Sequence, residues 1–392
     1  MLPLEGITVI ALEHAVAAPF ASRQLADLGA RVIKVERPGK GDFARGYDTR
    51  ARGLSSHFVW TNRSKESLTL DLKSKAGMGI LHDLLKDADI LVQNLAPGAS
   101  DRIGLGFDTL HETHEKLIVC NISGYGPDGP ETDRKAYDLL IQAEAGFLSI
   151  TGTDAQPSKA GISVADIAAG MYAYTNILAA LLQRGKTGKG VEINVSMLEA
   201  LAEWIGYPMY YASDDATPPA RAGAAHATIF PYGPFLAGDG KEVMLGLQNE
   251  REWSVFCRDI LGAPALETDP RFATNTDRAA HKSELSAIII TAFSKWTSEE
   301  VIAKLSTAGI ANARMNDMAG LWAHPQLAAR KRWRVVETPV GPMPALLPPG
   351  GLGNSEPRMD SIPELGGDTL AILQSLGFKS EDIDVLKTQG VI

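Results

Sequence analysis

Short apolar strands alternate with helical segments over the first 125 residues, and this alternation constrains the fold more than any other feature of the sequence. Such a pattern is typical of repeated βαβ units, which build a parallel sheet. The sequence predicts strands at 7–12, 31–36, 68–72, 90–94 and 117–122, with helices at 19–28 and 75–85. We therefore expect an α/β fold with a Rossmann-like open parallel sheet, which binds ligands beyond the carboxyl ends of its strands.

The remainder of the chain is expected to complete this domain and to form a smaller one, since 392 residues suggest two or three domains. A buried helix is predicted over 166–183, a strand over 191–195 and a helix over 197–211. Beyond the break at Pro218-Pro219, a region with its own strands and helices follows. We expect a large α/β domain (1–200 and 330–392), a small α+β domain (225–325) and two linkers (201–224 and 326–350).

Charge and composition exclude several classes of function. The net charge of −9 argues against a nucleic-acid or anionic-membrane surface. No apolar run approaches the 18 residues of a membrane span, and the N-terminus lacks the features of a signal peptide. Two distant cysteines and eight scattered histidines predict neither disulfides nor a metal site. We expect a soluble, cytoplasmic protein without nucleic-acid or membrane partners.

Several common catalytic motifs are absent. The turn after the first predicted strand, residues 12–19, contains no G-x-G-x-x-G, and no G-x-x-x-x-G-K-[ST] occurs in the chain. These absences count against a nicotinamide dehydrogenase and a P-loop NTPase. There is also no G-x-S-x-G, which leaves Ser-His-Asp catalysis without support.

Asp166 is the leading candidate for a reactive group. It stands at the start of the apolar helix, between Gly161 and Gly170, which allow close backbone approach. One interpretation is an N-terminal cap, a position that aspartate favours. The other is a nucleophile, because apolar flanks would desolvate the carboxylate and make it reactive toward a thioester or anhydride. The local sequence leaves both interpretations open.

Basic residues follow the predicted strands and would meet at one rim of a parallel sheet. Arg37, Lys73 and Arg102 come after the second, third and fourth strands. They could bind phosphates, or they could be solvated surface charges. The segment from Lys135 to Asp138 adds a basic, aromatic and acidic cluster, and His226 lies in a loop of small residues that would let a ligand approach closely.

Taken in order, these segments resemble the family III CoA-transferases, the family of the formyl-CoA:oxalate and carnitine CoA-transferases. The similarity runs from residue 3 to the C-terminus and is weakest between about 210 and 320. It rests on Pro3 to Ile7, Leu28 to Pro38, Gly41-Asp42, Leu70 to Lys73, Asn94 to Gly98, Gly124 to Gly126, Ala136 to Asp138 and Thr187 to Gly190.

The resemblance implies roles for individual residues. Asp166 matches the family's nucleophile, which forms a mixed anhydride and then an aspartyl-CoA thioester. CoA is implied as a substrate and no prosthetic group is implied. The fold implied is an interlocked homodimer of two-domain chains. The implied CoA-binding residues are Val16, Ala17, Arg37, Lys73, Asn94, Leu95, Arg102, Lys135, Tyr137 and Asp138.

Two features bear on the substrate. Val16 replaces the glutamine of the oxalate enzymes, and the loop around His226 resembles that of relatives that handle C4–C5 dicarboxylates. We expect succinyl-CoA as donor and citramalate, mesaconate, itaconate or glutarate as acceptor, with His226, Arg45 or Arg52 holding the distal carboxylate. The alternatives are an α-methylacyl-CoA racemase, which needs a histidine where Tyr137 stands, and a CoA-binding protein without turnover.

Overall fold

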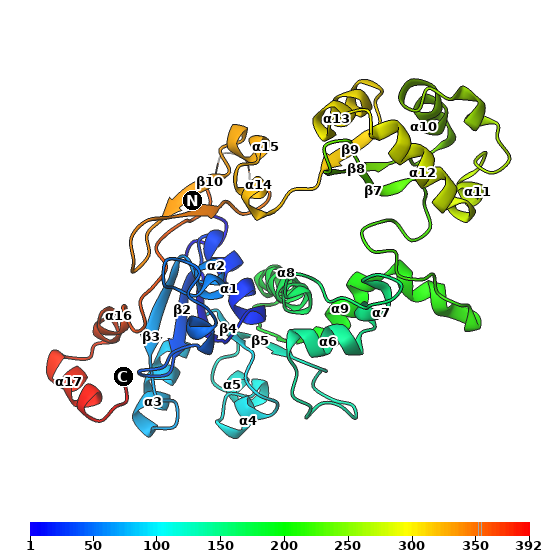
Figure 1. Cartoon of the computed structure of the whole chain (residues 1–392). Coiled ribbons are helices and arrows are strands. Elements are labelled where there is room, and N and C mark those ends of the chain that lie inside the picture. Colours follow the sequence, from blue (N-terminus) through cyan, green and yellow to red (C-terminus); the bar gives the residue numbers. More distant parts are fainter. Residues whose placement is uncertain (352, 354) are drawn as a thin grey trace. The chain divides into compact units, whose positions relative to one another are not determined.

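The computed structural model describes residues 1–351, 353 and 355–392, and the chain forms two compact units. Unit 1 contains Met1–Gly146, Ala160–Gly206 and Leu327–Ile392, and unit 2 contains Phe147–Lys159 and Tyr207–Gln326. Figure 1 shows that the chain returns to unit 1 after unit 2. Residues 147–159 belong to unit 2, although the sequence pattern places them in the large domain.

Unit 1 is built on a six-stranded sheet in the order β3-β2-β1-β4-β5-β6, in which all neighbours are parallel. This confirms the predicted α/β class. The third strand begins three residues before its predicted start, because Lys65 and Ser67 are buried polar residues that an apolar pattern misses. The strands are β1 (Thr8–Leu12), β2 (Arg31–Glu36), β3 (Lys65–Thr69), β4 (Ile90–Gln93), β5 (Ile118–Ser123) and β6 (Glu192–Ser196).

Helices cover both faces of this sheet (Figure 1). Alternate strand residues, such as Ile10, Ile33 and Leu91, pack with α3, α16 and α17 on one face. On the other face, α1 contacts β1, β2 and β4, while α8 contacts β5 and β6. The helices of unit 1 include α1 (Ala17–Asp27), α2 (Ser56–Thr61), α3 (Lys75–Leu85), α4 (Ala99–Arg102), α5 (Phe107–His111), α6 (Asp138–Glu144), α8 (Val164–Thr187), α9 (Met197–Ile205), α16 (Thr369–Ser375) and α17 (Ser380–Thr388).

The long helix α8 packs closely against α1. Small residues repeat on one of its faces, at Ala165, Ala169 and Ala173, and allow the two backbones to approach. At Gly170 a β-carbon would lie 2.7 Å from the carbonyl oxygen of Ala17. By length and composition alone α8 is also apolar enough to cross a membrane, which corrects the expectation that no segment is. It packs on α1, α6 and α9, and 39% of its apolar stretch is buried, so the predicted buried helix is buried along one face only.

A two-stranded antiparallel sheet occupies part of the predicted linker 326–350. Its strands are β10 (Trp333–Val336) and β11 (Met343–Leu346). Val336 of β10 packs with Phe58 and Ile362 in a small apolar cluster. This part of the chain is therefore an ordered piece of unit 1 and not a simple connection.

Unit 2 has its own antiparallel sheet, in the order β7-β8-β9, packed on helices. Trp253, Phe256 and Phe293 are fully buried in its core. β9 was not predicted, because its four residues, ANAR, include no β-branched or aromatic side chain and the run is short. The elements are α7 (Phe147–Ile150), β7 (Tyr232–Leu236), β8 (Glu242–Gly246), α10 (Glu250–Val255), α11 (Asn275–Ala280), α12 (Lys282–Phe293), α13 (Ser298–Thr307), β9 (Ala311–Arg314) and α14 (Met318–Trp322); α15 (Pro325–Ala329) follows where the chain re-enters unit 1.

Candidate active site

Asp166 lies in the first turn of α8 and is partly buried. The first N–H groups of a helix have no partner within the helix and need one from outside. Ser163, at the N-cap position, makes no capping side-chain bond. Instead, Oδ1 of Asp138 accepts the N–H of Ala165 at 2.8 Å and the N–H of Asp166 at 3.2 Å. The cap is thus supplied by α6, and Asp166 itself is not the cap.

The Asp138 carboxylate is held in place by the buried side chain of Gln142. The Nε2 of Gln142 donates to Oδ2 of Asp138 at 2.6 Å, and its Oε1 accepts the N–H of Ala160 at 2.9 Å. Both carboxylate oxygens of Asp138 are therefore engaged by protein donors. This arrangement favours a role in shaping the start of α8 over direct contact of the carboxylate with CoA.

The Asp166 carboxyl group has an unusual electrostatic setting. Burial raises its pKa, and the negative charge of Asp138 raises it further, to about 7. Within the described part of the chain, no lysine, arginine or histidine forms an ion pair with Asp166. The pKa of Tyr47 is raised to about 12 by burial and by nearby acidic groups, Asp166 among them, so this phenol lies near the carboxyl group. A basic, unpaired carboxylate of this kind is suited to nucleophilic attack.

The start of α1 lies beside the same turn of α8. Gly170, one helical turn after Asp166, touches the backbone of Ala17. Val16, the N-cap residue of α1, makes no capping side-chain bond. The positive end of the α1 dipole is therefore available for negative charge that develops near Asp166.

The loop that leads from β1 into α1 is fixed by bonds from two other segments. The Asn94 amide, just after β4, accepts the N–H of His14 and donates to its carbonyl oxygen, both at 2.9 Å. The next residue, Ala15, has φ +63°, a left-handed conformation, and its N–H donates to Oδ1 of Asp42 at 3.1 Å. β1 and β4 are neighbours at the point where the strand order reverses, which is where open α/β sheets bind ligands.

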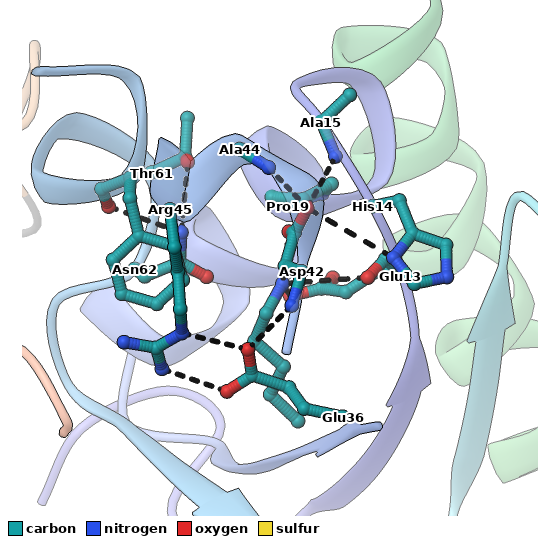
Figure 2. A network of polar contacts seen from close by, with 12 residues as sticks. Glu13, His14, Ala15, Pro19, Glu36, Asp42, Ala44, Arg45, Thr61 and Asn62 are labelled. Atoms are coloured by element: carbon teal, nitrogen blue, oxygen red, sulfur yellow. Dashed lines mark hydrogen bonds and ion pairs between the residues drawn. The ribbon is translucent and has the colours of Figure 1, made fainter. Parts of the chain in front are cut away.

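A buried cluster of charges lies beneath this loop (Figure 2). Glu13 contacts Nζ of Lys65 at 2.6 Å and Nζ of Lys34 at 3.3 Å, and Lys34 also contacts Asp42 at 2.8 Å. All four side chains are buried. Burial alone raises the pKa of Glu13, but Lys65 and Lys34 outweigh it and lower the pKa to about 2. We refer to Glu13, Lys34, Asp42 and Lys65 as the buried charge cluster.

The comparison with known sequences decides the family. CoA-transferase family III matches residues 4–369 of this chain. The protein belongs to this family. The succinate–glutarate CoA-transferase of Agrobacterium fabrum is 36% identical, and the match covers 84% of each chain. The acetyl-CoA:oxalate CoA-transferase of Acetobacter aceti is also 36% identical, again over 84% of each chain.

A solved structure shows the same fold. A CAIB/BAIF family protein from Brucella suis superposes with a TM-score of 0.84 at 31% sequence identity. The superposition covers 96% of this chain and 99% of that one. This CoA-transferase therefore shares the fold of that protein along almost its whole length.

The basic residues predicted to bind CoA are exposed in this CoA-transferase. Arg37, Lys73 and Leu95 follow β2, β3 and β4 at the ligand-binding edge of the sheet. Burial lowers the pKa of His14, and the negative charge of Asp42 opposes this effect. The positive charges of Lys34 and Arg37 lower the His14 pKa further. The Arg37 charge therefore lies near the loop after β1, where the strand order reverses between β1 and β4. Arg102 and Lys135 are also exposed, with the Arg102 guanidinium donating to the carbonyl oxygen of Pro97 at 3.2 Å.

Two predicted anchors for a substrate carboxylate lie in unit 1. Arg45 makes two bonds to Glu36, at 2.8 and 2.7 Å, and its guanidinium stacks on Phe58 at 3.8 Å. Figure 2 shows this pair face to face, so Arg45 is already committed to the fold. Arg52 is exposed and donates to the carbonyl oxygen of Pro342 at 2.9 Å, which leaves most of its donors for a ligand.

His226, the third predicted anchor, lies in unit 2 with its ring stacked on Tyr232. Its Nδ1 faces the N–H groups of Thr228 and Ile229 at 3.1 and 3.0 Å. Because Nδ1 accepts these bonds, the ring carries its proton on Nε2. His226 can therefore offer its Nε2–H as a donor to a ligand.

Two features of the site were not predicted from the sequence. The contact of Asp138 with the start of α8 joins residues 27 positions apart, which no local pattern reveals. Tyr47 lies in a short segment with no recognisable motif. The close backbone approach expected at Gly170 is present, and the segment that approaches is α1, which the sequence did not indicate.

Proposed function

We propose that this enzyme transfers CoA from succinyl-CoA to a C4–C5 dicarboxylate through covalent intermediates on Asp166. The observation that carries the proposal is the Asp166 carboxyl group, which is partly buried, has a raised pKa and has no cation partner among the described residues. Glutarate, citramalate, mesaconate and itaconate are the proposed acceptors. A relative that is named for succinate and glutarate supports this class.

The chemistry proceeds by four exchanges at the Asp166 carboxyl group. The carboxylate attacks the thioester carbonyl, and CoA leaves as a thiolate from the mixed anhydride. The thiolate then attacks the aspartyl carbon, which releases succinate and forms an aspartyl-CoA thioester. The acceptor carboxylate displaces this thiolate to form a second anhydride, and the thiolate finally attacks the acceptor carbon and frees Asp166. Water must be excluded throughout, because hydrolysis competes at every step.

The start of α1 supports these steps. Each attack places negative charge on a carbonyl oxygen. The N-terminus of α1, where Val16 provides no side-chain cap, packs against α8 at Gly170, one helical turn after Asp166. Fixed backbone dipoles of this kind stabilise developing charge without having to reorganise. The buried charge cluster and Asn94 hold the loop that leads into α1, so they support the site from below.

The choice of acceptor rests on two residues. Val16 is buried and apolar and offers no side-chain amide, which favours a larger dicarboxylate than oxalate. His226 is proposed to contact the distal carboxylate through Nε2–H, with Arg52 as a further contact. Of the alternatives, racemisation lacks an imidazole before Asp138, where the exposed Tyr137 stands.

We further propose that the protein is cytoplasmic, acts as a homodimer and uses no prosthetic group. Exposed apolar side chains of unit 1, among them Leu182 and Trp204, are suited to contact a second copy. Size-exclusion chromatography with light scattering tests the dimer. A monomeric mass would contradict it.

The direct test is to incubate the protein with succinyl-CoA and a panel of carboxylates and to identify new acyl-CoA species by mass spectrometry. Asp166→Asn is expected to lower the exchange rate at least about a thousandfold. Hydroxylamine is expected to trap the acylated residue in the wild type and not in the variant. Exchange at the native rate in Asp166→Asn would refute the covalent route, and binding without any turnover would leave a CoA-binding protein.

The role of His226 has its own test. In His226→Ala we expect the preference for glutarate over a monocarboxylate of equal length to fall about tenfold, because one hydrogen bond to a charged group is lost. His281→Ala, in the same unit, is the matched control, since its Nδ1 lies against the carbonyl oxygen of Asp277. An unchanged preference in His226→Ala removes this residue from the substrate site.

A further inference from the structure

The carboxylate of Asp138 is a charged group that the proposed reaction does not use. It lies at the first residue of α6, and its Oδ1 accepts the N–H groups of both Ala165 and Asp166. Its Oδ2 is held by Gln142. An acid that caps the helix carrying another acid brings two negative charges together, which a structural cap alone does not require, since serine or asparagine would cap equally well.

We propose that Asp138 is a positioning residue that sets the reactivity of Asp166, by fixing the start of α8 and by keeping positive charge and hydrogen-bond donors away from the nucleophile. This inference rests on the proposed role of Asp166. It assigns to the Asp138 side chain a task other than binding CoA.

Asp138 occupies the backbone donors at the start of α8. An aspartate in the first turn of a helix is normally stabilised as an anion by the free N–H groups and by the helix dipole. Here Asp138 takes the N–H groups of Ala165 and Asp166 for itself. Its negative charge also offsets the positive end of the α8 dipole. The Asp166 carboxylate is thereby deprived of the usual stabilisation at this position.

The other charged groups around α8 lie on the elements that pack against it. The elements packed on it are α1, α6, α9, β5 and β6. On α1, Arg23 and Asp27 pair with each other at 2.7 Å. Within the described chain, Asp138 is the charged group that acts on the Asp166 carboxyl. The other titratable or charged groups on or beside these elements are Tyr47, Tyr137, Glu144, Tyr172, Tyr174, Arg184, Lys186, Glu192, Glu199, Glu203 and Cys120.

The lack of paired charges and donors bears on how well Asp166 can act as a nucleophile in the proposed reaction. A carboxylate that is neither paired nor hydrogen-bonded is more basic, and a more basic carboxylate is the stronger nucleophile toward a thioester. The Gln142 bridge to the N–H of Ala160 fixes the direction of the Asp138 carboxylate. Asp138 thus keeps the nucleophile in place and keeps it reactive.

The experiment separates charge from capping. Asp138→Asn keeps an oxygen for the two N–H groups and removes the charge, but its amide meets the amide of Gln142, so one bond is lost. The double variant Asp138→Asn with Gln142→Glu restores that bond, because the new carboxylate accepts from the asparagine amide and from the N–H of Ala160. The double variant therefore keeps the cap and moves the charge one side chain away from Asp166.

The main readout is the pH dependence of Asp166 acylation in single-turnover reactions with succinyl-CoA. The acid limb of this profile reports protonation of the nucleophile. We expect it to move to lower pH by about one unit in Asp138→Asn and by less in the double variant, because a neighbouring negative charge is removed or displaced. The melting temperature is expected to fall in the single variant and to recover in the double variant.

A carbon-13 NMR titration of the aspartate carboxyl groups reads the same shift without activity, with the Asp166 signal assigned from its absence in Asp166→Asn. An unmoved Asp166 titration in Asp138→Asn overturns the inference, and so does an acid limb that stays in place while the rate follows the melting temperature. If the NMR titration shifts but the wild type exchanges no thioester, the proposed function fails and the inference about Asp138 stands.

Discussion

Two carboxyl groups of unit 1, the fully buried Glu13 and the partly buried Asp166, have opposite electrostatic settings. Glu13 lies between Lys34 and Lys65, which hold its pKa at about 2 despite full burial. Asp166 has no cation partner among the described residues, and Asp138 beside it adds to the effect of burial, so its pKa is about 7. Burial acts in the same direction on both groups. The neighbouring charges therefore decide which carboxyl is held as an anion by cations and which is left without a counter-charge.

The difference also separates stability from chemistry. The buried charge cluster holds the loop between β1 and α1, and a paired anion there is inert. At the start of α8 the Asp166 carboxyl has no cation partner in the described part of the chain, which lowers stability and, under the proposed function, raises its reactivity. An energetic cost of this kind is expected at a reactive site and not in the residues that hold the site in place.

The largest expected effect on stability comes from removing the negative charge of Glu13 in the buried charge cluster. Glu13→Gln leaves Lys34 and Lys65 with one fewer negative partner in a buried setting. We expect the free energy of unfolding to fall by about 3–5 kcal/mol, because a buried charge is left uncompensated. Denaturant unfolding of the purified protein measures it. A loss no larger than that of a surface ion pair would contradict the assigned role of the cluster.

The second effect uses pH to compare the same two groups. The Asp166 pKa is raised on folding, so its contribution favours the folded state below about pH 4 and is lost as pH rises through about 7. The Glu13 pKa is lowered, so its contribution is present above about pH 4.5 and is lost as pH falls toward about 2. Replacing Asp166 by Asn removes this pH dependence. We therefore expect the unfolding free energy of Asp166→Asn minus that of the wild type to be larger at pH 8 than at pH 4 by about 2–3 kcal/mol. Parallel stability curves for the two proteins over this range would disprove the raised pKa.

The third effect concerns the contact between α1 and α8. In Gly170→Ala the new methyl group would lie 2.7 Å from the Ala17 carbonyl oxygen and 3.0 Å from the Phe20 ring. We expect a loss of about 1–3 kcal/mol in unfolding free energy together with a fall in activity, because the helices must separate. Gly185→Ala, on the same helix with nothing within 4 Å, is the matched control. It is expected to be neutral or stabilising by up to about 1 kcal/mol.

The smallest expected effect on stability concerns the Arg31–Glu66 ion pair near the surface, which contrasts with the buried charge cluster. Arg31 makes two bonds to Glu66 at 2.8 Å across β2 and β3; the Arg31 side chain is exposed and that of Glu66 is partly exposed. Arg31→Gln is expected to lower the unfolding free energy by less than about 1 kcal/mol, since water screens such pairs. Added salt should diminish even this difference. A loss as large as that of Glu13→Gln would mean that burial does not distinguish the two sites.

Much of unit 1 could be predicted from local sequence. The strand and helix periods gave the parallel sheet, and the helix at 75–85 was placed at the bounds observed for α3. Local reasoning also singled out Asp166 at the start of an apolar helix. It could not show whether that residue caps the helix, because the true cap, Asp138, comes from another helix.

The misplaced features share a physical cause, namely contacts between distant segments. The start of β3 was predicted three residues too late, because a lysine such as Lys65 is typical of the protein surface. Lys65 is buried here because it pairs with Glu13, which lies 52 residues earlier in the chain. Arg45 looked available for substrate because its partner Glu36 lies on another element. The tautomer of His226 depends on a turn whose backbone donors point at one ring nitrogen. Pattern and propensity do not encode such pairings.

The near-contact of Gly170 with the Ala17 carbonyl has a consequence for how the catalytic cycle runs. Two helices that meet backbone to backbone resist sliding past one another, so the Asp166 carboxyl group is held in a fixed position. In both halves of the proposed exchange, the group that moves would then be the thiol end of CoA, between the bound acyl group and the aspartyl carbon.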